Sequence, residues 1–278
     1  MPVIQPERLK QQAAELAQNF LDCDQFARSL DNLLNLYAER AVRPSQSGEP
    51  SPLLDKYGVP PPVLRYILLA VSPYVQAHPG AALALCDRLW QEPILEFRNL
   101  AIGILGKIPS NQAGQVVARV KNWAEQESER RLRSSLFEAG FSGVRKNNSE
   151  LILTLAQDWL LDPGLDKQKL GLMALLSLAS DLEFENLPIF FKFLTPIAIN
   201  IQSELRPELL DIMLVLARRS PPETAYFIQE LLLIPGCQTA GWLARQLMPH
   251  FPEVVAETVR QALYAASNQP TRPLPPYN

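Results

Sequence analysis

The sequence predicts an all-α fold, an α-α superhelix (solenoid) built from HEAT-like helical hairpin repeats. Three observations favour it: apolar residues recur at helical spacing, prolines stand where helices would begin, and these starts repeat about every 35–40 residues. No alternating apolar run with β-branched residues and a hairpin turn is evident. Hydrophobic residues make up 47% of the 278 residues, which is ample for a core.

The prolines mark the expected helix starts. Proline suits the first turn of a helix because its missing N–H has no partner there in any case. Glutamate follows several of them, as in Pro6-Glu7, and places negative charge at the positive end of the helix dipole. Ser220 and Glu223 also have the spacing of a capping box. Helices are therefore expected to open at or next to Pro6, Pro79, Pro93, Pro188, Pro207, Pro221 and Pro252.

Apolar stripes run between these starts. The segment from Leu170 to Ala179 is apolar nearly all round, which is typical of a helix covered by its neighbours. A second helix carries a one-sided stripe, with its charged residues largely away from it. The members of that stripe are Leu205, Leu209, Ile212, Met213 and Leu216.

Pairs of helices make up each predicted repeat, within a single domain over residues 1–267. Two segments depart from the pattern: residues 42–62 read as a long loop, and residues 268–278 as a proline-rich flexible tail. The string from Arg272 to Tyr277 is of the kind that aromatic grooves accept, and a solubilising end is the alternative. The paired helices are expected to begin near Ser149 and Asp166, near Asn186 and Pro207, and near Pro221 and Cys237.

Composition limits the classes of function. The formal net charge is −3, whereas dedicated nucleic-acid binders usually carry a basic excess. Cys23, Cys86 and Cys237 lie far apart without metal-ligand spacing, so we expect buried free thiols in a reducing cytosol, with neither metal nor cofactor. No secretory signal or membrane-spanning stretch is evident, which predicts a soluble, cytoplasmic protein. Phosphate-binding glycine loops and the common hydrolase motifs are missing.

One stretch, from Lys121 to Glu127, combines residues suited to binding a cation. On a helix, Trp123 and Glu127 are one turn apart on the same face. An indole beside a carboxylate can hold a cationic group, the ring through its negative face and the acid through its charge. The alternative interpretation is a core tryptophan beside a solvated glutamate.

The sequence Asn122-Trp123-Ala124 followed by Glu127 resembles the active-site helix of the DNA alkylation repair family. Members of this family are HEAT-like-repeat glycosylases that excise alkylated purines. The resemblance extends from about residue 50 to 235 through short motifs. They are Lys56-Tyr57-Gly58-Val59-Pro60 with Leu64-Arg65, Ala84-Leu85 with Leu89-Trp90, Glu96-Phe97-Arg98-Asn99-Leu100-Ala101, and Gln168-Lys169 with Leu172-Met173-Ala174-Leu175-Leu176.

The resemblance implies roles for three residues. Trp123 would be an aromatic wall against the damaged nucleotide, and Glu127 stands where the family has an aspartate that stabilises the developing sugar cation. Lys169 stands where the family has an arginine that contacts the DNA backbone, but lysine lacks the planar fork that grips a phosphate. A second aromatic wall would fall near Ile212 or Met213, and neither is aromatic. The extra methylene of glutamate can displace a carboxylate by about 1 Å, enough to cost about a hundredfold in rate.

Basic residues outnumber acidic ones between Arg119 and Lys146, although the chain as a whole is acidic. Such a patch can face phosphates, and a solvated helix face with interspersed charges is the alternative. The residues predicted to contact double-stranded DNA are Arg130, Arg131, Arg133, Arg145 and Lys146.

Three hypotheses for the function follow. The first is a family member that binds DNA through the concave face of the repeats, with weak or no base-excision activity. The second is an active alkylpurine DNA glycosylase, in which Trp123, Glu127 and Lys169 are the catalytic residues. The third is a non-enzymatic scaffold with a protein partner. Salt-dependent binding to DNA separates the first two from the third, and release of methylated purine separates the second from the first.

Overall fold

The computed structural model describes residues 5–38 and 54–267. Helices form nearly all of the regular structure there, and β-type pairing in these ranges is limited to a bridge between Asp55 and Ile94. The predicted all-α fold is therefore confirmed. The contacts group the chain into two compact units, Met1–Ile152 and Leu153–Asn278.

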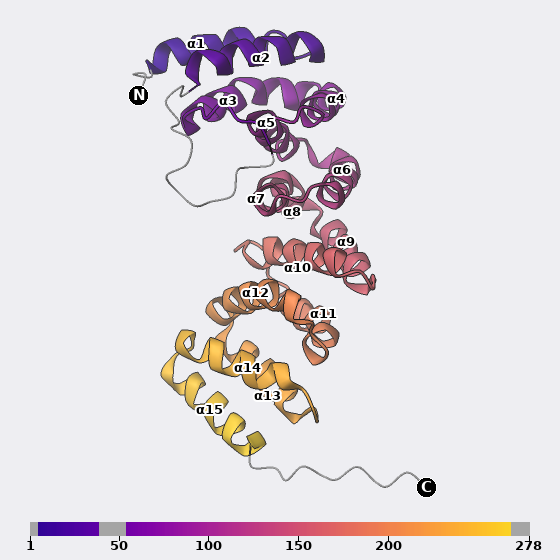
Figure 1. Ribbon diagram of the computed structural model, residues 1–278, viewed down its shortest axis with the longest axis vertical. Coiled ribbons are helices and arrows are strands. Elements are labelled where there is room, and N and C mark those ends of the chain that lie inside the picture. Colours follow the sequence, from indigo (N-terminus) through magenta and orange to yellow (C-terminus); the bar gives the residue numbers. More distant parts are fainter. Residues whose placement is uncertain (1–4, 39–53, 268–278) are drawn as a thin grey trace. The chain divides into compact units, whose positions relative to one another are not determined.

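The first unit is built from hairpins of helices that pack side by side (Figure 1). α1 packs against α3, α3 against α5, and α4 against both α2 and α5. Its helices are α1 (Pro6–Ala17), α2 (Cys23–Tyr37), α3 (Pro61–Ala77), α4 (Pro79–Trp90), α5 (Leu95–Leu105), η1 (Ser110–Gln112), α6 (Ala113–Gln126), α7 (Arg130–Ser135), the π-helical turn η2 (Leu136–Gly140) and α8 (Ser142–Asn147).

The second unit repeats the hairpin theme in two layers. α11, α13 and α15 pack in sequence in one layer, and α10, α12 and α14 in the other. The stripe predicted from Leu205 to Leu216 is fully buried, as are most residues of the apolar segment from Leu170 to Ala179. The helices are α9 (Ser149–Leu161), which crosses the boundary, α10 (Leu165–Ala179), α11 (Pro188–Ile199), η3 (Ser203–Leu205), α12 (Arg206–Arg219), α13 (Pro221–Leu233), α14 (Gln238–Leu247), η4 (Met248–His250) and α15 (Glu253–Ser267).

All of the predicted helix starts lie within two residues of an observed start, including the six starts of the three repeats. The prediction at Pro93 is off by two residues, because α5 begins at Leu95. The cause is the bridge to Asp55: the Asp55 N–H donates to the Pro93 carbonyl at 3.2 Å, and the Leu95 N–H donates to the Asp55 carbonyl at 2.9 Å. This pairing keeps Ile94 extended and delays the helix.

The two predicted irregular segments fall largely outside the described residues. Residues 54–60, at the end of the predicted loop, are non-helical, and residues 42–53 lie outside the description. The loop prediction is wrong at its last two positions, because α3 already begins at Pro61. The predicted tail, residues 268–278, also lies outside the described residues.

The capping box predicted at Ser220 is wrong. The Ser220 hydroxyl donates to the carboxylate of Glu223, and its oxygen caps no backbone N–H of α13. The Ser220 carbonyl instead accepts from both the N–H and the hydroxyl of Thr224, at 3.0 Å and 2.8 Å. No helix in the part of the chain that the structure describes is long and apolar enough to cross a membrane.

The three cysteines are free and differ in burial, which predicts their reactivity. Cys86 is fully buried and its thiol donates to the Ala101 carbonyl at 3.4 Å, whereas Cys23 and Cys237 are only half-buried. Burial raises the pKa of Cys86 strongly, and burial with the neighbouring Asp24 raises the pKa of Cys23. Because the thiolate is the reactive form, a raised pKa slows alkylation at neutral pH.

We therefore expect iodoacetamide to label Cys23 and Cys237 in the native protein, and Cys86 only after unfolding. Mass spectrometry of peptides from a time course measures the three rates, and a sample in denaturant is the control. Rapid labelling of Cys86 in the native protein would contradict the close packing of α4 against α5.

Candidate functional site

The helix that carries Trp123 ends before it reaches Glu127. α6 stops at Gln126, and Glu127 takes an extended conformation with φ −84° and ψ 135°. Its N–H still donates to the Trp123 carbonyl at 2.9 Å, but its side chain leaves the helical path. The expectation that both side chains share one helix face is therefore wrong, because Glu127 caps the helix instead of continuing it.

Trp123 lies in the core of the first unit, with only 4% of its surface exposed. Its indole stacks on that of Trp90 from α4, with ring centroids 4.4 Å apart and planes 4° from parallel. The guanidinium of Arg98 lies over the Trp90 ring, 4.9 Å from its centroid. Stacked aromatic pairs and cation–π contacts of this kind stabilise the packing of adjacent helices. The face of Trp123 that stacks on Trp90 is thus covered within the protein.

Glu127 is also buried, with 7% of its surface exposed. One carboxylate oxygen accepts from the Arg98 guanidinium at 2.5 Å. The other accepts from the backbone N–H groups of Ser128 and Glu129, both at 2.8 Å. These two amides directly precede α7, so the carboxylate fixes the turn between α6 and α7 and balances the charge of Arg98 at the same time. We name Trp90, Arg98, Trp123 and Glu127 the tryptophan–arginine cluster.

Glu96, the second residue of α5 and two residues after the bridge residue Ile94, holds the backbone of an earlier segment in the same way. It is buried, and its carboxylate accepts from the N–H of Tyr57 at 3.1 Å and of Gly58 at 2.8 Å. Gly58 has a φ of 65°, a left-handed conformation that favours glycine. The Tyr57 hydroxyl donates to the Asp31 carboxylate, and burial together with this bond raises the pKa of Tyr57.

Sequence reasoning assigned no role to Glu96, Arg98 or Trp90. A signal for the first two was present: they are the two charged residues in the first turns of α5, a helix that is otherwise mostly apolar. A charged residue on such a helix is buried at low cost only with a matching partner, so each one indicates a specific contact.

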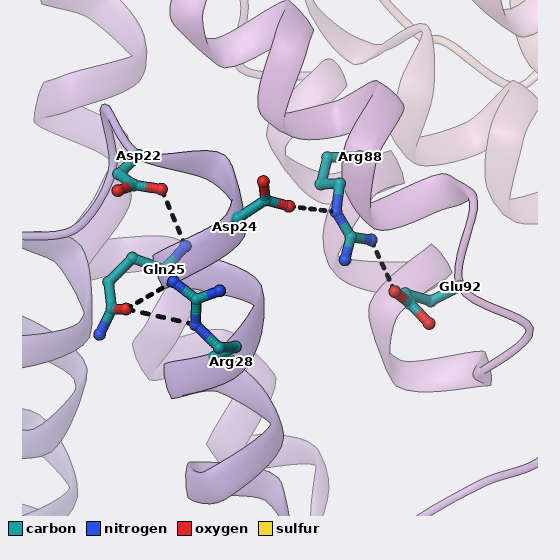
Figure 2. A network of polar contacts seen from close by, with 6 residues as sticks. All are labelled: Asp22, Asp24, Gln25, Arg28, Arg88 and Glu92. Atoms are coloured by element: carbon teal, nitrogen blue, oxygen red, sulfur yellow. Dashed lines mark hydrogen bonds and ion pairs between the residues drawn. The ribbon is translucent and has the colours of Figure 1, made fainter.

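A second charged network lies between α2 and α4 (Figure 2). Arg88 bridges two carboxylates, with Asp24 at 2.8 Å and Glu92 at 2.6 Å, and it lowers the pKa of Asp24 through its hydrogen bond. The network borders a cleft of about 340 Å³ lined by Arg28, Asp31 and Phe97 among others. Since acidic side chains balance its arginines, the cleft offers no excess positive charge for a phosphate. The residues drawn are Asp22, Asp24, Gln25, Arg28, Arg88 and Glu92.

The five basic residues predicted to contact DNA lie on two short helices, the first three on α7 and the last two on α8. Arg130, Arg131 and Lys146 are exposed, and Arg133 and Arg145 are half-buried. The Arg133 Nε donates to the Ala124 carbonyl at 3.2 Å, and one Arg145 nitrogen donates to the Phe137 carbonyl at 2.8 Å. The exposed cations therefore stand on short helices that the half-buried arginines attach to α6 and η2.

The remaining predicted residues lie in the second unit. Lys169 is a half-buried residue of α10. Ile212 and Met213, where a second aromatic wall would fall, are fully buried in α12 and contribute to the core. The structure thus gathers Trp123 and Glu127 into one cluster of the first unit, and Lys169 belongs to the other unit.

Comparison with known proteins gives one family match. The family described as DNA alkylation repair enzyme matches residues 54–196, just over half of the 278 residues. That range includes the tryptophan–arginine cluster, the basic residues of α7 and α8, and Lys169. The chain is also similar to the X-ray structure of YibA from Escherichia coli, at 13% identity and a TM-score of 0.32, over 95% of this chain and 98% of that one. No curated protein matches the sequence.

Proposed function

The chain belongs to the DNA alkylation repair enzyme family, and from that premise we propose that it binds double-stranded DNA without efficient base excision. The observation that carries the proposal is the state of Glu127: its carboxylate is buried and already holds Arg98 and two backbone N–H groups. The binding surface is the exposed basic side of α7 and α8.

Base excision needs a carboxylate that can face the sugar while positive charge develops there. For Glu127 to do this, its carboxylate would have to break its ion pair with Arg98 and its hydrogen bonds with the N–H groups of Ser128 and Glu129. The guanidinium and the two N–H groups would then lose this partner. Removing one partner of a buried ion pair costs about 3–5 kcal/mol of stability. Each buried polar group left without a hydrogen bond costs about 1–3 kcal/mol. Trp123 is similarly engaged, because its ring stacks on Trp90. The side chains that resemble the family's catalytic set therefore support the fold of the first unit.

The proposed DNA binding depends on the positive charge of exposed side chains on α7 and α8. Phosphate contacts by lysine and arginine release condensed counterions, so affinity falls with salt at a slope of about −0.9 for each phosphate neutralised. Three exposed cations, Arg130 and Arg131 on α7 and Lys146 on α8, suit such contacts, and both short helices pack against η2. Because the chain as a whole carries a net charge of −3, we expect DNA to contact this surface and not the acidic remainder of the chain.

Fluorescence anisotropy with a labelled duplex, measured between 50 and 200 mM salt, tests this surface. We expect the double variant Arg130→Gln/Arg131→Gln to weaken binding and to make the slope shallower by about 1.8. The matched control, Arg8→Gln/Lys10→Gln, removes the same charge from exposed positions of α1 in the same unit and is expected to change the slope little. Equal losses in both variants would refute the assignment to α7, and salt-independent or absent binding would refute DNA binding and favour the scaffold.

Release of methylated purine from alkylated duplex DNA tests the lack of excision. We expect release no faster than the spontaneous background, both for the native protein and for Glu127→Gln. If the native protein releases methylated purine and Glu127→Gln abolishes the release, the carboxylate must leave Arg98 during catalysis. The proposed lack of excision would then be wrong. The circular dichroism spectrum of the variant controls for loss of structure.

A further inference from the structure

An apolar groove of about 690 Å³ runs between α11 and α13 in the second unit. The buried side chains of Phe227 and Leu231 form its floor, and the Phe191 ring lies 5.1 Å from that of Phe227. Tyr226, with 62% of its surface exposed, lines it from α13. The groove is lined by Pro188, Phe191, Thr195, Pro222, Glu223, Tyr226, Phe227, Glu230, Leu231 and Ile234.

The chemistry of this lining selects an apolar ligand that also carries positive charge. Aromatic rings and a proline-lined end favour a polyproline-type segment, which loses little conformational entropy on docking. Glu223 and Glu230 contribute carboxylates, and among the described residues no lysine or arginine lines the groove. Glu223 accepts from the Ser220 hydroxyl, whereas exposed Glu230 has no ion-pair partner within residues 54–267. Glu230 is therefore the carboxylate available to a cation in the ligand.

One segment of this chain has that composition and continues from a helix that packs against α13. Residues 268–278 read Asn-Gln-Pro-Thr-Arg-Pro-Leu-Pro-Pro-Tyr-Asn, four prolines with one arginine and no acid. They follow Ser267 at the end of α15, and α15 packs against α13. Eleven residues in a polyproline II conformation reach about 34 Å, and the 13 residues of α13 are about 20 Å long. The segment is thus long enough to extend along the whole of α13.

We infer that the groove between α11 and α13 is the docking site of the chain's own proline-rich segment, residues 268–278. Pro273, Leu274 and Pro275 occupy the aromatic floor, and Arg272 pairs with Glu230. The contact is independent of the proposed DNA binding, because the groove lies in the second unit and α7 and α8 in the first.

A competition experiment on the full chain tests the inference. The probe is a fluorescein-labelled peptide of residues 268–278. The proteins are the native chain and a full-length tail variant in which Pro270, Pro273, Pro275 and Pro276 are replaced by serine. A tethered segment has an effective concentration on the order of 1 mM, so a peptide with a Kd of about 0.1 mM should bind the native chain about tenfold more weakly than the tail variant. The tail variant thus reports the affinity of the open groove.

Three further substitutions, made in the tail variant, locate the peptide. Tyr226→Ala should weaken binding at least tenfold, and so should Glu230→Arg. A peptide carrying Arg272→Glu should regain affinity for the Glu230→Arg protein, which identifies the pair. Asp158→Arg, a change at an exposed carboxylate of α9 outside the groove, is the matched control and should leave binding unchanged.

Several results would overturn the inference. Absence of peptide binding to the tail variant would show that the groove does not accept this segment. Equal affinity for the native chain and the tail variant would show that the chain's own segment is not in the groove. Sedimentation that reveals concentration-dependent association of the native chain, lost in the tail variant, would place the segment in a second copy.

Discussion

Replacing Gly106 with alanine is expected to lower the free energy of unfolding by about 3 kcal/mol. Gly106 follows α5, and a Cβ atom there would lie 1.9 Å from the Ala139 carbonyl oxygen and 2.6 Å from the Ser142 hydroxyl. The first is a backbone atom of η2, which cannot rotate away as a flexible side chain can. The φ of Gly106 is −69°, open to any residue, so the expected loss comes from the close approach of α5 to η2 and α8.

Gly114→Ala is the matched control for this prediction. Gly114 is the second residue of α6, and a Cβ there would meet no described atom within 4 Å. Alanine has a higher helix propensity than glycine, by at most about 1 kcal/mol, so this variant should be as stable as the native protein or slightly more stable. Urea unfolding followed by circular dichroism measures both. Equal urea midpoints for Gly106→Ala and the native chain would show that η2 can move away from the added methyl group without loss of stability.

Arg98→Met is expected to lower the free energy of unfolding by about 3–5 kcal/mol. The methionine keeps an apolar stem near Trp90 but removes the guanidinium that pairs with Glu127. The carboxylate is then left buried with its charge balanced only by two backbone N–H groups. Urea unfolding measures the loss, and adding Glu127→Gln should recover part of it, because the uncompensated buried charge is then gone.

Arg88→Met is the control for the arginine itself. Arg88 also bridges two carboxylates, but Asp24 is largely exposed and the pair is screened by water. Exposed ion pairs contribute about 0–1 kcal/mol, so this variant should unfold close to the native midpoint. Equal losses for Arg88→Met and Arg98→Met would contradict the distinction between a buried and an exposed pair.

The sequence predicted the helices well, because their starts depend on local chemistry. Proline at the first turn acts within a few residues, so Pro79, Pro188 and Pro221 each mark a start that the structure confirms. The stripe from Leu205 to Leu216 is buried for the same reason, since one helix face determines it. Pro93 departs because its neighbour Ile94 is held extended by Asp55, a residue distant in sequence.

The candidate site was harder to predict, because its geometry depends on contacts between distant residues. The residues after Trp123 are compatible with a continuing helix, and the end at Gln126 goes with the bonds of Glu127 to Arg98, Ser128 and Glu129. Arg98 lies 29 residues earlier, beyond the reach of helical periodicity. The alternative of a core tryptophan agrees with the burial of Trp123, whereas a solvated glutamate does not agree with the burial of Glu127.

The two buried glutamates have a consequence for the order in which the growing chain can be completed on the ribosome. The N–H groups of Tyr57 and Gly58 depend on Glu96, which is translated 38 or more residues later. Until α5 leaves the exit tunnel, the segment before α3 cannot form these two hydrogen bonds, and its amides stay hydrated. Arg98 arrives with Glu96 but must itself await Glu127. The segment before α3 can therefore close once α5 has emerged, whereas the turn into α7 closes only after the end of α6 has followed.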